Sequence, residues 1–269
     1  MKIKYVRLVL KMLLIALLVS SCVDPFEAAT KNYESILVIE ATITNELKYQ
    51  EVNLGRTYRL ENDGPLYESN ANVTITDDAQ NTYDFQDLGT GKYRSVVAFK
   101  AELGRQYQLM INTSDGRSYS STPQHIVSNQ GLDRVYANKS QDVNGNDGIS
   151  IFLDSYDPSG NSKYYRYEYL ETFKVVAPYA SGSDAFEVTY QPPVYEIVPR
   201  IEEKRVCYKT NASNTIMQMQ TLSLSEDRVS QFPILFIAED DYKTTYQYSI
   251  LVKQFVQTLE SYNFYKTLN

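Results

Sequence analysis

The sequence has few of the residues from which catalytic and metal sites are most often built. Its 269 residues include one histidine, two cysteines and no tryptophan. A Ser-His-Asp triad needs a positioned imidazole. The single candidate, His125, lies on the connector between the two predicted domains, and the chain has no G-x-S-x-G motif. Zinc sites need clustered histidine and cysteine ligands, which are missing. We therefore expect no catalytic residues, no cofactor and no enzymatic activity of these kinds.

Long hydrophobic runs are also missing, and the longest apolar segment lies near the start of the chain. Residues 12–19 are apolar, which is far short of the ~20 residues that a membrane-spanning helix needs. Small Ser20 and Ser21 follow, and then Cys22. Four basic residues precede this run: Lys2, Lys4, Arg7 and Lys11. A basic leader, a short apolar segment and small residues at the cut predict a secretory signal peptide.

The residues around Cys22 resemble a bacterial lipobox. In a lipobox the cysteine thiol is acylated and the chain is cut just before it, which implies a signal peptide over residues 1–21 and a tether over residues 22–34. The covalent lipid on Cys22 would anchor the protein stably, because several acyl chains hold a protein at a bilayer surface. Asp24 and Glu27 look like the acidic signal that directs Bacteroidota lipoproteins to the cell surface, so we expect the outer membrane, facing outward.

Positive charge is scarce in the expected mature chain. Removing residues 1–21 takes away four basic and no acidic residues, which leaves 22 basic against 33 acidic residues and a net charge of −11. Nucleic acids and anionic lipids attract basic surfaces. We therefore expect no nucleic-acid partner.

Alternating apolar and polar residues run through most of the chain and predict β-strands. Residues 72–77 and 82–85 form one predicted hairpin, and in residues 164–176 Tyr165, Tyr167 and Tyr169 share one face. Strands at this spacing predict an all-β fold of tandem antiparallel β-sandwich (Ig-like) domains. We place the first at residues 33–125 and a tyrosine-rich second domain at residues 126–269. Residues 181–184 and 192–193 are predicted to be loops, and residues 257–268 one short C-terminal helix.

Two further features suggest sites. Asp142, Asn144 and Asn146 carry oxygens at alternate positions, as calcium loops do, but the glycine and the bidentate glutamate of such loops are missing. We prefer a polar hairpin there. Cys207 has no cysteine partner in the chain once Cys22 is lipidated, so either it is buried or its partner is missing from this chain.

Several segments together resemble a family of Bacteroidota lipoproteins. They are the lipobox with Asp24-Pro25 and residues 36–39, 71–77, 91–93, 104–109, 115–120, 164–168, 177–179, 207–208, 232–234 and 248–254. The chain is identified as a member of the "domain of unknown function 4249" family, which carries no assigned catalytic residues. The resemblance implies a companion of TonB-dependent, SusC-like transporters, and also that the second domain is incomplete because the family pattern continues past the terminal helix.

These observations favour a non-enzymatic accessory or binding component of a TonB-dependent nutrient uptake system, with a glycan or peptide as possible cargo. One alternative is a surface glycan-binding module that stacks sugars on tyrosine faces. Another is a glycan or peptide hydrolase that uses a carboxylate pair, because 33 acidic residues offer many pairs.

Overall fold

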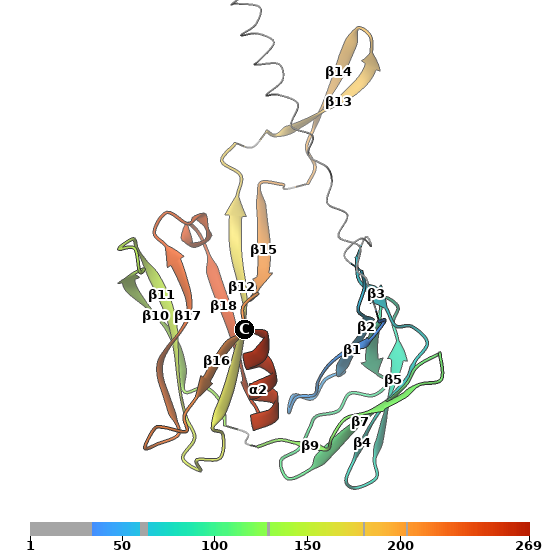
Figure 1. Cartoon of the computed structure of the whole chain (residues 1–269). Coiled ribbons are helices and arrows are strands. Elements are labelled where there is room, and N and C mark those ends of the chain that lie inside the picture. The colour runs from blue at the N-terminus through green and yellow to red at the C-terminus, as the bar shows by residue number, and fades with distance from the viewer. Residues whose placement is uncertain (1–33, 60–63, 128–129, 180, 203) are drawn as a thin grey trace, which may run out of the picture.

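The computed structural model describes residues 34–59, 64–127, 130–179, 181–202 and 204–269. These residues form antiparallel β-sheets and one short C-terminal helix, so the predicted all-β fold is confirmed (Figure 1). The signal peptide, Cys22 and the tether up to residue 33 lie outside the described residues. No helix in the described part of the chain has both the length and the apolar character to span a bilayer.

The first nine strands form one continuous antiparallel sheet. Its strand order is β1-β2-β6-β5-β4-β7-β8, with β3 beside β2 and β9 beside β7. The strands are β1 (Leu37–Thr42), β2 (Glu51–Arg56), β3 (Leu66–Tyr67), β4 (Asn72–Asp77), β5 (Thr82–Asp87), β6 (Lys92–Ser95), β7 (Gln106–Asn112), β8 (Ser118–Ser120) and β9 (Gln124–His125). Their inward side chains meet in one cluster, so the sheet curves around its own core.

Alternation explains how this first core forms. Val52 and Leu54 of β2 and Val73 and Ile75 of β4 are buried, while their neighbours along each strand are more exposed. Because successive side chains of a strand point to opposite faces, the period-two pattern gives one apolar face per strand. Tyr93 of β6 is fully buried at the centre of this cluster, and its hydroxyl is hydrogen-bonded to backbone groups.

The second set of strands builds two facing sheets. One contains β10 (Arg134–Gln141), β11 (Asp147–Tyr156) and β17 (Arg228–Ala238). The other is built on β12 (Tyr164–Val176), which pairs with β15 (Val206–Ala212), β16 (Met217–Gln220) and β18 (Tyr248–Val256). Side chains from β11, β12 and β17 share one core, which makes this part a sandwich. A short 3-10 helix, η1 (Tyr242–Thr244), precedes β18.

Tyrosines supply much of this second core. Tyr165 and Tyr167 are 1% and 0% exposed, and their rings stack with centroids 6.3 Å apart. The predicted tyrosine face of residues 164–176 is therefore confirmed for these two side chains. Their burial means that they pack the sandwich and do not offer a surface to sugars.

The other face of β12 holds the C-terminal helix, α2 (Leu259–Leu268). Arg166 lies between the rings of Phe255 and Tyr265, with its guanidinium carbon 4.4 and 4.5 Å from their centroids. Tyr262 is the buried residue of the helix and packs against Tyr164. The contacts of Tyr265 with Arg166 and of Tyr262 with Tyr164 therefore hold α2 against β12. The helix begins two residues later than predicted.

The two cores fall on either side of the predicted domain boundary. The buried members of the first lie between Leu37 and Ile111, and those of the second between Ile151 and Ile237. Among the described residues, no strand of the first set pairs with a strand of the second. The boundary at residue 125 itself stays a prediction.

Candidate functional site

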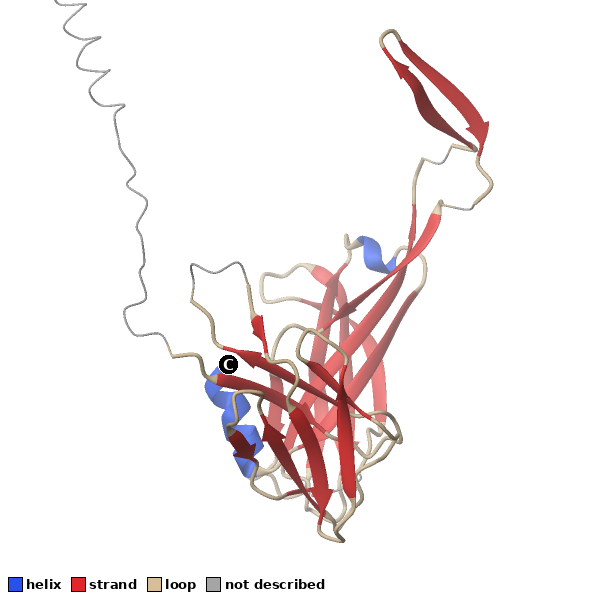
Figure 2. Ribbon diagram, turned by 90° about the vertical axis from the view of Figure 1, so that its right-hand side faces the viewer, coloured by secondary structure: helices blue, strands red, loops and turns tan. Residues whose placement is uncertain are grey.

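A free-standing hairpin is the most unusual surface feature of the structure. It consists of β13 (Ser183–Tyr190) and β14 (Pro193–Pro199), and we call residues 183–199 the arm. Within the described residues these strands pair only with each other. The arm extends well beyond the ends of the remaining strands (Figures 1 and 2). Neither core cluster contains a residue of the arm, so both of its faces are open.

The arm carries large apolar side chains that no other described part of the chain covers. They are Phe186, Val188, Tyr190, Val194, Tyr195 and Ile197, which are between 51% and 81% exposed. Isolated two-stranded hairpins are at best marginally stable in water, and contiguous exposed apolar surface is typical of interaction sites. The arm therefore has the composition of a surface that binds another molecule.

The arm is joined to the sandwich by a continuation of the β12–β15 ladder. Beyond the Val176–Val206 pair, Ala177 N–H donates to the Arg205 carbonyl (2.8 Å). At the base of the arm the Arg200 side chain donates to Asp184, and this bond holds the pKa of the carboxyl below its ordinary value. The connection is thus made of paired backbone and a charged contact.

The structure corrects part of the loops predicted at residues 181–184 and 192–193: residues 181–182 lie outside the strands and Pro192 lies in a turn, as predicted, but residues 183–184 and 193 belong to strands. Residues 183–190 and 193–199 are strands, and only residues 191–192 form the turn, with a cis bond before Pro192. The sequence did hold a signal, because Phe186, Val188 and Tyr190 alternate with polar residues. Pro192 and Pro193 are typical of loops, so the alternation alone does not identify a hairpin here.

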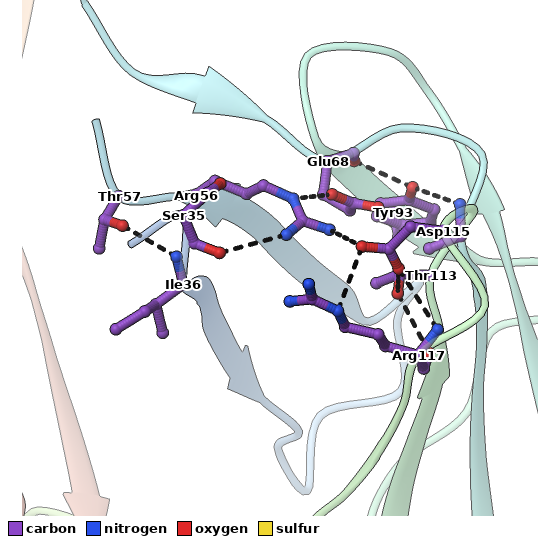
Figure 3. A network of polar contacts seen from close by, with 10 residues as sticks. Ser35, Ile36, Arg56, Thr57, Glu68, Tyr93, Thr113, Asp115 and Arg117 are labelled. Atoms are coloured by element: carbon purple, nitrogen blue, oxygen red, sulfur yellow. Dashed lines mark hydrogen bonds and ion pairs between the residues drawn. The ribbon is translucent and has the colours of Figure 1, made fainter. Parts of the chain in front are cut away.

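A polar network lies where the described chain begins. Figure 3 shows the Arg56 guanidinium between two carboxylates, those of Glu68 (2.5 Å) and Asp115 (3.2 Å). Arg117 also faces Asp115, with 3.6 Å from its Nε to the carboxylate. The hydrogen bond to Glu68 raises the pKa of Arg56, and a hydrogen bond from Thr113 is the main reason why the pKa of Asp115 lies below its ordinary value.

This network fastens the first described residues to the sheet. Arg56 donates to the Ser35 carbonyl (3.4 Å), and the Thr57 hydroxyl donates to the Glu34 carbonyl (2.7 Å) while accepting from Ile36 N–H (3.0 Å). A hollow of about 510 Å³ lies beside these contacts. Its lining contains two guanidinium groups and two carboxylates, so its charge is balanced. The arrangement can act as a clamp at the end of the tether.

Two buried acids, Asp157 and Asp227, come together in the second sandwich. Ser162 N–H lies within hydrogen-bond distance of both carboxylates (3.0 and 3.1 Å). Asp227 also accepts from the hydroxyls of Tyr165 (2.8 Å) and Thr221 (2.5 Å). Both acids are 3% exposed. The carboxylate oxygens accept hydrogen bonds from groups inside the protein, so this pair of acids stabilises the sandwich.

A third buried acid, Glu171 of β12, is held in the same way. Its carboxylate accepts from Lys243 (2.9 Å), Asn211 (3.0 Å) and Tyr248 (3.0 Å). Burial would raise the pKa of Glu171, but these donors outweigh burial and lower it. Burial, with the bond to Glu171, raises the pKa of the Tyr248 hydroxyl.

The residues singled out from the sequence lie apart from one another. Asp142 is in the turn between β10 and β11, where its carboxylate accepts from the backbone of Asn144 and Asn146 (2.8 Å each) and from the Asn146 amide. The structure therefore has the polar hairpin expected there. His125 is exposed on β9. Cys207 is exposed on β15 opposite Val175, so the alternative of a buried thiol is wrong. In the described part of the chain, no three His, Cys, Asp or Glu side chains are grouped as metal ligands.

A comparison with models of protein families assigns the chain to a family. The model described as "Domain of unknown function (DUF4249)" matches residues 23–269. The chain belongs to this family. The DUF4249 match contains both sets of strands and the arm. No curated protein and no solved structure matches the chain.

Proposed function

We propose that this DUF4249 protein is a lipid-anchored lipoprotein of the Bacteroidota outer membrane. In this proposal it faces outward and serves as a non-enzymatic accessory or binding component of a TonB-dependent, SusC-like uptake system. The lipobox residues that end in Cys22 support the anchor. The family membership supports the assignment to this class of lipoprotein.

The single observation that carries the binding role is the uncovered arm. Six large apolar side chains project from a ribbon that has no contact with either core. Burial of one such side chain contributes roughly 1.5–3 kcal/mol. A partner that covers the arm therefore gains much of its affinity from groups that are already exposed and ordered as strands.

The clamp around Arg56 supports the anchored arrangement. It ties residues 34–36 to β2 directly after the expected tether. These hydrogen bonds join the residues that follow the expected tether to the folded sheet. The acids buried in the sandwich are engaged in internal hydrogen bonds, which supports binding over the alternative of a carboxylate-dependent hydrolase.

Membrane fractionation tests the anchor, and co-purification tests the partner. Metabolic labelling with an alkyne analogue of palmitate is expected to mark the wild type and not Cys22→Ala, which should also leave the membrane fraction. Cys207→Ala is the matched control and should remain lipidated and membrane-bound. Wild-type protein purified from outer membranes should carry a TonB-dependent transporter. Recovery of no transporter above the level of an unrelated lipoprotein would contradict the uptake role.

A further inference from the structure

The hydrogen-bond pattern of the arm shows which backbone groups are available to a partner. Arg200 N–H donates to the Gly182 carbonyl (2.8 Å), one step before the Ser183–Pro199 pair. In an antiparallel ladder, opposed pairs alternate between bonded and non-bonded. Ser183–Pro199, Ala185–Ile197 and Glu187–Tyr195 are therefore the non-bonded pairs, which fits the missing N–H of Pro199. The backbone groups of these pairs point outward, along the two free edges.

The two free edges are not equivalent. The edge of β14 is bounded by Pro193 and Pro199, which have no N–H to offer and stop a neighbouring strand at both ends. The edge of β13 contains no proline, and in its regular part, from Ser183 to Glu187 before the register shift at Val188, the N–H groups of Ala185 and Glu187 face outward. The open edge of β13 is therefore the better template for an added strand.

The side chains beside this edge indicate the chemistry of the segment that fits it. Residues 183–199 contain three acidic and no basic residues. Asp184 is paired with Arg200, whereas Glu187 and Glu196 form no ion pair within the described residues. Opposite charges on directly facing residues of neighbouring strands are favourable. A partner segment is therefore best matched to this edge if it places a basic residue beside Glu187. The small side chain of Ala185 leaves room for an apolar residue of that segment.

A lipid surface suits the arm less well than a protein does. The hydrocarbon region of a bilayer satisfies no backbone hydrogen bonds, so open sheet edges are not found there. Both edges of the arm carry outward backbone groups, and Glu187 and Glu196 add charge. A protein strand can satisfy these groups and still cover the apolar face formed by Tyr195 and Ile197.

We propose that the arm receives an extended segment of a partner protein as a third strand along the outer edge of β13. The segment carries a basic side chain beside Glu187 and an apolar one beside Ala185. The inference rests on the proposed function only for the choice of a transporter as the partner, because the edge chemistry applies to any protein that docks there.

Photo-crosslinking in intact cells tests the proposal with the full lipidated chain. The crosslinking residue p-benzoylphenylalanine replaces Tyr195 on the arm in one variant and Tyr208 on β15 in the matched control. Both side chains are 60% exposed. The Tyr195 variant should crosslink to one outer-membrane protein, through a peptide that mass spectrometry maps to an extended segment, and the Tyr208 variant should not.

Two substitutions in the Tyr195 crosslinking variant test the edge itself. Ala185→Pro removes an outward N–H and should lower the crosslinking yield about tenfold, the effect of one lost interface hydrogen bond that leaves its acceptor unpaired. Ala185→Ser keeps the N–H and a small side chain, and should leave the yield nearly unchanged. Hydrogen exchange of the inward Phe186 amide reports whether the arm stays paired. If Ala185→Pro unpairs the arm, Glu187→Lys and Glu187→Gln are compared instead. The lysine variant should then show the larger loss of crosslinking yield.

The outcomes separate the two proposals. A protein crosslink that depends on the β13 edge supports the added strand, and if that protein is not a TonB-dependent transporter, only the uptake role fails. Crosslinks to lipid alone, crosslinks to a second copy alone, or no crosslink would overturn the added strand. A yield that neither Ala185→Pro nor Glu187→Lys lowers would overturn it as well.

Discussion

Replacement of Asp157 by asparagine should destabilise the second sandwich in a pH-dependent way. The Asp157 carboxylate accepts from the backbone and hydroxyl of Ser159 (2.9 and 2.6 Å) and from those of Ser162 (3.0 and 2.5 Å). Asparagine would turn an amide N–H₂ toward one of these pairs of donors. A buried polar group that loses its partner costs about 1–3 kcal/mol.

The pKa of Asp157 gives an independent measure of the same effect. Burial alone would raise this pKa, but the hydrogen bonds from Ser159 and Ser162 outweigh burial and lower it from 3.8 to about 2. At about 1.4 kcal/mol per pKa unit, the charged form contributes about 2 kcal/mol to the free energy of unfolding. Because the folded-state pKa is the lower one, this contribution is complete above pH 3.8 and is lost as the pH falls toward 2.

Scanning calorimetry of the purified protein at several pH values measures the difference. At pH 7, Asp157→Asn should lower the melting temperature of the second sandwich by about 5–10 °C, the shift that 2–3 kcal/mol gives in a domain of this size. Between pH 4 and pH 2 the two proteins should converge. Asp142→Asn is the matched control, because Asp142 makes similar turn hydrogen bonds near the surface, and it should lower the melting temperature less than Asp157→Asn does. A difference that persists at pH 2, or an equal cost at both positions, would refute the reasoning.

Two further predictions concern the two cores. Gly91→Ala should destabilise the first sheet by more than about 2 kcal/mol, because the added Cβ would lie 2.1 Å from the Leu54 carbonyl oxygen. Gly89→Ala is the control: Gly89 has a similar positive φ but open space around it, so the substitution should cost about 1 kcal/mol. Chemical denaturation measures both. Lys243→Met leaves the buried Glu171 without its cation and should lower the free energy of unfolding by about 2–3 kcal/mol at pH 7. This loss is smaller than for a fully buried pair, because Lys243 is partly exposed. Chemical denaturation at pH 3 should show a smaller loss, and an equal loss would contradict the electrostatic explanation.

Most of the fold could be predicted because its strands have one buried face. Residues 72–77 and 164–176 were predicted with the bounds that the structure has. Burial of one face forces alternation, and alternation is visible in the sequence. The helix was recognisable for a similar reason, since Tyr262 and Tyr265 recur at helical spacing and face β12 and Arg166.

The arm and the buried acid clusters could not be predicted in the same way. Both faces of the arm are exposed, so no core selects its pattern, and Pro192 and Pro193 are typical of loops. Asp157 and Asp227 are 70 residues apart in the chain, and Ser162 brings them together only in the folded sandwich. Cys22 is the reverse case, because its lipidation is predicted from sequence and lies outside the described residues.

The asymmetry of the arm explains how an apolar ribbon can remain exposed and still be selective. A hydrophobic hairpin with two open edges is a template for aggregation. Pro193 and Pro199 block one edge, and the negative charges of Glu187 and Glu196 repel a second copy of the same ribbon. What remains is one edge beside one carboxylate. That edge discriminates between partners by a hydrogen-bond register and a charge, so apolar burial supplies affinity while β13 supplies specificity.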